Sequence, residues 1–82
     1  MDDLVKAQLV ALAEKMEMLA VLCEQHEINF KVPGFMESGV YVLRRMRDEI
    51  LKAVMDDSWE SVNLQDVHMV LDVMEGAYST HH

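Results

Sequence analysis

A cluster of basic side chains gives this sequence its clearest candidate for binding chemistry. Four of the seven Lys and Arg residues lie between Arg44 and Lys52, in the stretch RRMRDEILK. Guanidinium and ammonium groups at this density neutralise phosphates, which is how proteins hold a nucleic-acid backbone. The stretch also contains two acids, so its net charge is only +2. The choice is therefore between a phosphate-binding patch and a solvated helix face.

Helical spacing favours the solvated face for three of these cations. Arg44 and Arg45 each lie four residues before an acid, and Lys52 lies four residues after Asp48. Such pairs stabilise a helix by about 0.2–0.5 kcal/mol each. A face that reads nucleic acid would add Ser, Thr, Asn or Gln between the cations, and residues 40–52 contain none. We expect a largely self-paired face, and keep Arg44, Arg45 and Lys52 as candidates for contacting a partner.

Arg47 differs, because its direction on a helical wheel falls inside the apolar arc. No acid lies three or four positions away from it. Its stem can cover apolar neighbours while the guanidinium reaches solvent, or the guanidinium can pair with a carboxylate of another helix or another chain. A buried, unpaired guanidinium would be costly. Glu14 and Glu17 are candidate partners within the chain, and both arrangements remain open.

Other reactive side chains do not form a catalytic or metal-binding pattern. His68, Asp72 and Glu75 fall on one helical arc, but no HExxH motif or second ligand pair accompanies them. No serine lies in a GxSxG context, and the glycines cannot build a phosphate loop. We expect no metal, no cofactor and no enzymatic activity.

The overall charge argues against non-specific binding to phosphates or anionic membranes. The chain has 82 residues and a net charge of −8, and residues 53–82 hold six acids and no Lys or Arg.

Cys23 is the single cysteine, which excludes an intramolecular disulfide. The acidic start MDDLVKAQLVALA does not resemble a signal peptide, and no apolar run is long enough to cross a membrane. We therefore expect a cytoplasmic protein.

Apolar periodicity predicts three helices, at about residues 3–25, 36–55 and 64–76. The expected fold is all-α, a small three-helix bundle with a long first helix, a second helix and a short third one, in a single domain over residues 1–80. Asn63 is the predicted N-cap of the third helix and Gly76 its predicted end. His81 and His82 are either native or the remnant of a purification tag, and we leave them out.

The first helix has two apolar stripes, which indicates that it is covered from two sides. One stripe is a heptad seam and the other is a narrower arc that contains Leu4, Ala7 and Ala11. Because 51% of the residues are hydrophobic, a chain this short has more apolar surface than it can easily bury. We therefore expect a homodimer. The residues predicted to mediate self-association are Val5, Leu9, Leu12, Met16, Leu19, Met18 and Leu22.

Several residues outside the helical seams are open to two interpretations. We expect Phe30 and Phe35 to tuck against the helices from an extended connection. The eight methionines suit mainly the core, and they also suit an adaptable protein-binding surface. Trp59, in an acidic loop, is either a core side chain or an exposed anchor for a partner.

Together these features favour a non-enzymatic protein–protein interaction module: a small acidic adaptor, inhibitor or regulatory subunit that acts as a homodimer. One alternative is a transcriptional regulator that binds nucleic acid through the Arg-rich second helix. Another is an acidic inhibitor that mimics nucleic acid and binds a basic protein through residues 53–82. The protein partner itself is not specified by the sequence.

Overall fold

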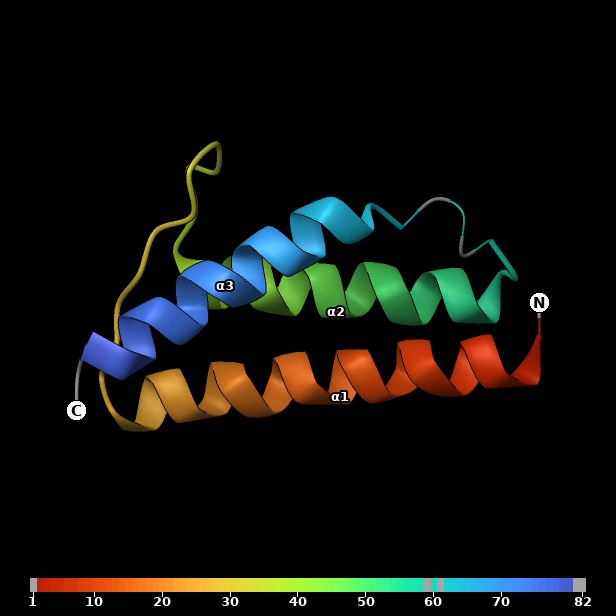
Figure 1. Cartoon of the computed structure of the whole chain (residues 1–82), viewed down its shortest axis with the longest axis horizontal. Coiled ribbons are helices and arrows are strands. Elements are labelled where there is room, and N and C mark those ends of the chain that lie inside the picture. The colour runs from red at the N-terminus through yellow and green to blue at the C-terminus, as the bar shows by residue number, and fades with distance from the viewer. Residues whose placement is uncertain (1, 59, 61, 81–82) are drawn as a thin grey trace.

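The structure, a computed structural model, describes residues 2–58, 60 and 62–80. Its helices are α1 (Asp3–Gln25), α2 (Gly39–Met55) and α3 (Leu64–Thr80) (Figure 1). No strand occurs in the described ranges, so the predicted all-α class is confirmed. Among these residues, no helix combines the length and apolar character that a membrane crossing requires.

Each helix begins at a polar side chain that accepts a hydrogen bond from the first turn. Asp2, Ser38 and Asn63 accept from backbone N–H groups of α1, α2 and α3 at 2.7, 3.3 and 3.2 Å. The cap predicted at Asn63 is confirmed. The predicted start of the second helix near residue 36 was wrong, because Ser38 is the N-cap and α2 begins at Gly39.

Helices α1 and α2 end in the same way, with a left-handed residue directly after the cap. After α1, the N–H of Ile28 donates to the carbonyl of Cys23 at 2.8 Å, and the N–H of Glu27 donates to that of Glu24 at 3.2 Å. These two bonds define a Schellman motif. Glu27 has φ of +55°, as does Asp57 after α2. Glycine is the residue that usually takes this position.

We expect Glu27→Gly to stabilise the protein by about 0.5–1 kcal/mol, because the left-handed conformation strains an L-residue more than glycine. Thermal unfolding should show an increase of a few degrees, since 1 kcal/mol corresponds to roughly 4–8 °C for a domain of this size. Gln25→Gly is the matched control, because Gln25 is the last residue of α1. There glycine should cost about 1 kcal/mol. A lower melting temperature for Glu27→Gly would contradict the prediction.

Helix α3 is longer than predicted. It continues through Gly76 to Thr80, so the short third helix was a wrong prediction. Gly76 is exposed and costs the helix about 1 kcal/mol relative to alanine. Ala77 and Tyr78 pack against the core, and these tertiary contacts outweigh that cost. Tyr78 also meets the ring of His26 edge-on, with the ring centroids 6.1 Å apart.

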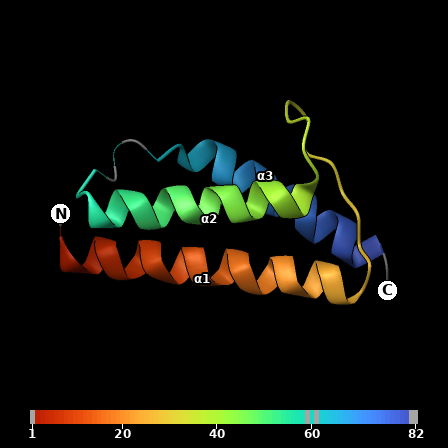
Figure 2. The same cartoon turned by 180° about the vertical axis from the view of Figure 1, so that it is seen from behind.

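The helices are arranged as an antiparallel pair crossed by a third helix. Figures 1 and 2 show α1 and α2 side by side, with α3 running obliquely past α2 toward the C-terminal end of α1. The core lies where the three helices meet. Its largest fully buried side chains are Met16, Leu43, Ile50, Met74, Val32, Val42, Val70 and Cys23.

The connection between α1 and α2 is packed at its base and projects at its tip (Figures 1 and 2). Phe30 is buried and Phe35 is partly buried against the core, as predicted. The tip is a turn at Pro33–Gly34, in which the N–H of Phe35 donates to the carbonyl of Val32 at 3.0 Å and Gly34 has φ of +89°. The base is tied to α2, because the N–H of Gly39 donates to the carbonyl of Phe30 at 2.8 Å.

Candidate functional site

The basic cluster of α2 is joined to α1 by ion pairs. Arg44 donates to both carboxylate oxygens of Glu24, at 2.6 and 3.0 Å, and its Nε lies 3.4 Å from Oε2 of Glu17. Arg47 also donates to Oε2 of Glu17. Its other guanidinium nitrogens donate to Asp48 at 2.8 and 2.9 Å. Glu17 is therefore shared by two arginines.

The antiparallel packing of the two helices explains this arrangement. Glu17 and Glu24 are seven residues apart, which places them on one face of α1. Arg44 and Arg47 are three apart on the facing side of α2. The open question about Arg47 is answered within the chain, because it pairs with Glu17 of α1 and with Asp48, its neighbour in α2. Its side chain keeps 24% of its surface exposed, so it lies at the edge of the helix interface.

The expected pairing of the cations within their own helix was wrong for Lys52, because among the described residues Asp48 pairs with Arg47 instead, and it was wrong for Arg44. Its pairs are with α1, and the guanidinium does not join Asp48. Two carboxylates spaced seven residues apart on α1 were the sequence signal for this. Arg45 does approach Glu49, but only at 3.9 Å.

The pKa values of this network follow from its hydrogen bonds. The guanidinium of Arg44 lowers the pKa of Glu24, chiefly through their hydrogen bond. The same bond, followed by the bond to Glu17, raises the pKa of Arg44. The pKa of Arg47 is raised chiefly by its hydrogen bond to Asp48. These arginines therefore stay charged and engaged with carboxylates at neutral pH.

We expect the stabilising effect of the Arg44–Glu24 pair to disappear in acid. The folded-state pKa of Glu24 lies below the ordinary value of 4.5. The contribution is therefore fully present above the unfolded-state pKa, and it is lost as pH falls through the folded-state value. The melting temperatures of wild type and Glu24→Gln should differ at neutral pH and converge in strong acid.

A double-mutant cycle isolates this effect. Glu24→Gln, Arg44→Met and the double variant give the coupling free energy of the pair at each pH. Coupling should be measurable at neutral pH and absent in strong acid. Coupling of equal size at both pH values would show that the carboxylate charge of Glu24 is not what stabilises the contact.

Arg45 braces the projecting connection. Its guanidinium lies over the ring of Phe35, 5.5 Å from the centroid, and its Nη1 donates to Glu37 at 2.9 Å. On the other side of the turn, Nζ of Lys31 donates to the carbonyl of Met36 at 2.5 Å. The side chain of Met36 is nevertheless 91% exposed. The loop thus presents one large apolar side chain from a fixed backbone.

The structure separates the residues that were predicted to mediate self-association. Leu9 and Met16 are buried in the core of the chain itself, so they are not available to a partner. The partly buried members Val5, Leu12 and Leu19 pack against the same core. Leu22 is partly buried, and Met18 is 56% exposed. Within the predicted set, Met18 and Leu22 are therefore the members on the second, outer stripe of α1.

The remaining predicted contact residues lie elsewhere. Lys52 is exposed and lines a shallow groove beside Asp56 and Val62. Trp59 lies outside the described residues. Met36 and Met55 are 91% and 85% exposed, which corrects their assignment to the core. Apolar periodicity gives no information on the burial of these two, because both lie beside loops rather than on a helical seam.

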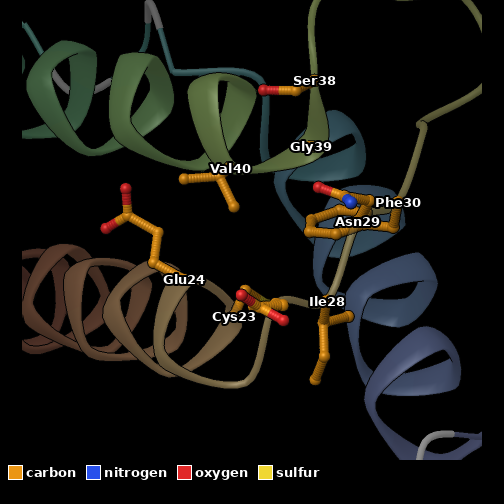
Figure 3. Close-up of a pocket in the computed structure, with 9 residues that line it drawn as sticks. Cys23, Glu24, Ile28, Asn29, Phe30, Ser38, Gly39 and Val40 are labelled. Atoms are coloured by element: carbon orange, nitrogen blue, oxygen red, sulfur yellow. The ribbon is translucent and has the colours of Figure 1, made fainter.

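An open cleft of about 620 Å³ lies between the C-terminal end of α1 and the N-terminal end of α2 (Figure 3). Two of its polar side chains already have structural roles, since Glu24 pairs with Arg44 and Ser38 caps α2. Burial raises the pKa of the Cys23 thiol, which disfavours the nucleophilic thiolate. The lining is Cys23, Glu24, Glu27, Ile28, Asn29, Phe30, Ser38, Gly39 and Val40.

The described part of the chain contains no group of three or more His, Cys, Asp or Glu side chains that could hold a metal. Comparison of the chain with protein-family models, with curated proteins and with solved structures finds no match. Function must therefore be inferred from the surfaces of the chain itself.

Proposed function

We propose that the chain is a non-enzymatic protein–protein interaction module: a small acidic adaptor, inhibitor or regulatory subunit that acts as a homodimer in the cytoplasm. The observation that carries this is the set of large apolar side chains more than half exposed around a closed core. They are Leu4, Met18, Met36, Tyr41 and Met55. Exposed apolar side chains that share one face mark protein-binding sites, and Leu4 and Met18 share one face of α1.

We propose that a different protein binds to the projecting loop and the first turn of α2. Met36 and Tyr41 are 91% and 54% exposed, and Arg45 lies over the ring of Phe35, the residue before Met36. Met, Tyr and Arg are the residue types enriched in protein interfaces. Because hydrogen bonds and an ion pair already fix the loop, little backbone entropy is lost on binding. A convex loop that exposes the side chain of Met36 fits an apolar pocket on its partner.

The ion pairs of the α2 arginines give little support to the alternative that the chain binds nucleic acid. Arg44, Arg45 and Arg47 each have a carboxylate partner within the chain. Phosphates would have to displace Glu24, Glu37 and Glu17, which are held at hydrogen-bonding distance. A gel shift at low salt should therefore show no complex with this protein. The acidic-inhibitor form of the proposal uses residues 53–82, and its complex should dissociate at moderate salt.

A photo-crosslinking experiment tests partner binding. p-Benzoylphenylalanine replaces Met36 in one variant and Met55, the equally exposed control, in another. In an extract of the native host, a specific adduct is expected from position 36 and not from position 55. The captured protein, once purified, should bind Met36→Ala about tenfold more weakly than wild type, because one buried apolar anchor is lost. Equal affinities would contradict the assignment of this surface.

A further inference from the structure

The outer stripe of α1 remains uncovered in the single chain. Leu4 and Met18 are 66% and 56% exposed, and Ala7 and Ala11 between them are exposed as well. Leu22 continues the stripe toward the C-terminal end of the helix. The inner face of α1 is fully used by the core, so this outer stripe belongs to a separate contact.

The spacing of the stripe matches a contact with a second helix. Leu4, Ala11 and Met18 follow one another at steps of seven, so they return to one line along α1 every two turns. Ala7 and Ala11 are small enough to let the axis of a neighbouring helix come close. The flexible side chain of Met18 can change its conformation to pack against Met18 of a second helix.

The charges beside the stripe select a second copy of this chain as the partner. Glu14 and Lys15 flank the stripe at nearly the same level. Lys15 is on the side of α3, where it approaches Glu75 at 3.9 Å. Glu14 is on the other side, next to Glu17, which pairs with α2. Glu14 and Lys15 balance each other at this level of the stripe, whereas the whole chain carries −8.

We propose that two copies of the chain pair through the outer stripe, with their α1 helices parallel. In a parallel two-fold pair, the flank that carries Glu14 faces the partner flank that carries Lys15. Both ion pairs then form reciprocally, and Leu4, Ala11 and Met18 meet their own equivalents. In an antiparallel pair like flanks meet instead, the Glu14 flank against the Glu14 flank and the Lys15 flank against the Lys15 flank, so neither ion pair can form. This inference rests on the homodimer of the proposed function.

Charge reversal tests the contact on the full chain. Light scattering should give twice the 9.4 kDa chain mass for wild type. Glu14→Lys and Lys15→Glu should each weaken dimerisation about tenfold, because each replaces two attractive contacts by two repulsive ones. An equimolar mixture of the two variants should recover the dimer. Met18→Glu should abolish it, and Met55→Glu, off this face, should leave it unchanged.

Cysteine cross-linking tests the orientation. Met18→Cys should form a disulfide-linked dimer on mild oxidation in the parallel arrangement, because each Met18 then meets its own equivalent, and the control Met55→Cys should not. Cys23 can remain, because it is buried. A mixture of Leu4→Cys and Met18→Cys chains that cross-links while Met18→Cys alone does not would show an antiparallel pair and overturn the orientation.

The outcomes separate the two proposals. A wild-type chain that stays monomeric at all concentrations would overturn both this contact and the homodimer of the proposed function. A wild-type dimer that is unchanged by Glu14→Lys and by Met18→Glu would overturn this contact alone. Circular dichroism of each variant confirms that its helices are intact before its mass is interpreted.

Discussion

Gly39→Ala should lower the free energy of unfolding by about 2–3 kcal/mol, whereas Gly76→Ala should raise it by about 1 kcal/mol. The two glycines lie in helices, so the same substitution is compared in two environments. A Cβ on Gly39 would lie 2.2–2.3 Å from the ring of Phe30, and a Cβ on Gly76 would meet nothing within 4 Å.

The ring of Phe30 cannot easily move aside. It is only 8% exposed, and the hydrogen bond from the N–H of Gly39 to the carbonyl of Phe30 ties the two backbones together. Adding a methyl group therefore overpacks the junction of the loop and α2. Gly76 meets no such obstacle, so alanine there gains helix propensity without a clash.

Chemical denaturation measures both effects, and a double variant identifies the cause. If the clash is responsible, Phe30→Leu should make room for the new methyl group. Gly39→Ala combined with Phe30→Leu should then cost less than the sum of the two single changes. Additive losses would show that Gly39 is required for another reason, and a destabilising Gly76→Ala would contradict the control.

Met16→Ala should cost about 2–5 kcal/mol, and Met55→Ala should cost little. Met16 is completely buried at the centre of α1, so truncation leaves a cavity in addition to the lost apolar burial. Met55 is 85% exposed at the end of α2 and touches mainly solvent. Urea unfolding of both variants provides the comparison.

Repeating the Met16→Ala unfolding experiment at several protein concentrations also tests whether Met16 lies at an interface between copies. Because Met16 contacts its own chain, the loss of stability should be the same at low and high protein concentration. A loss that shrinks or grows with concentration would place Met16 at an interface between copies. That would restore the first expectation from the sequence and contradict the burial seen here.

Helical periodicity carried enough information for the fold class and for most of the helix boundaries. Val67, Val70, Leu71 and Met74 recur at helical steps, and each of them is buried. The end of α3 could not be predicted in the same way. Local propensity favoured a stop at Gly76, and only the contacts of Tyr78 with residues distant in sequence overcome it.

The candidate site was less accessible to sequence reasoning, because its contacts join segments far apart in the chain. Pairs four residues apart can be read within one helix, but the partners of Arg44 lie 20 and 27 positions away. Choosing them requires the register of α1 against α2, and apolar periodicity does not give that register. For the same reason, the two stripes of α1 were visible in the sequence, but which of them faces the core was not.

The ion pairs between α1 and α2 also bear on how the molecule opens locally. This helix pair is held by apolar packing, by the arginine–glutamate contacts and by the junction of Phe30 with Gly39. In the described part of the chain, helix α3 docks mainly through apolar side chains, the ring contact of Tyr78 with His26 and a loose pair, Lys15–Glu75. Amide protons of α3 should therefore exchange with solvent through partial openings that leave α1 and α2 protected. On this basis the α1–α2 hairpin, which also carries both proposed binding surfaces, is the more persistent cooperative unit of the chain.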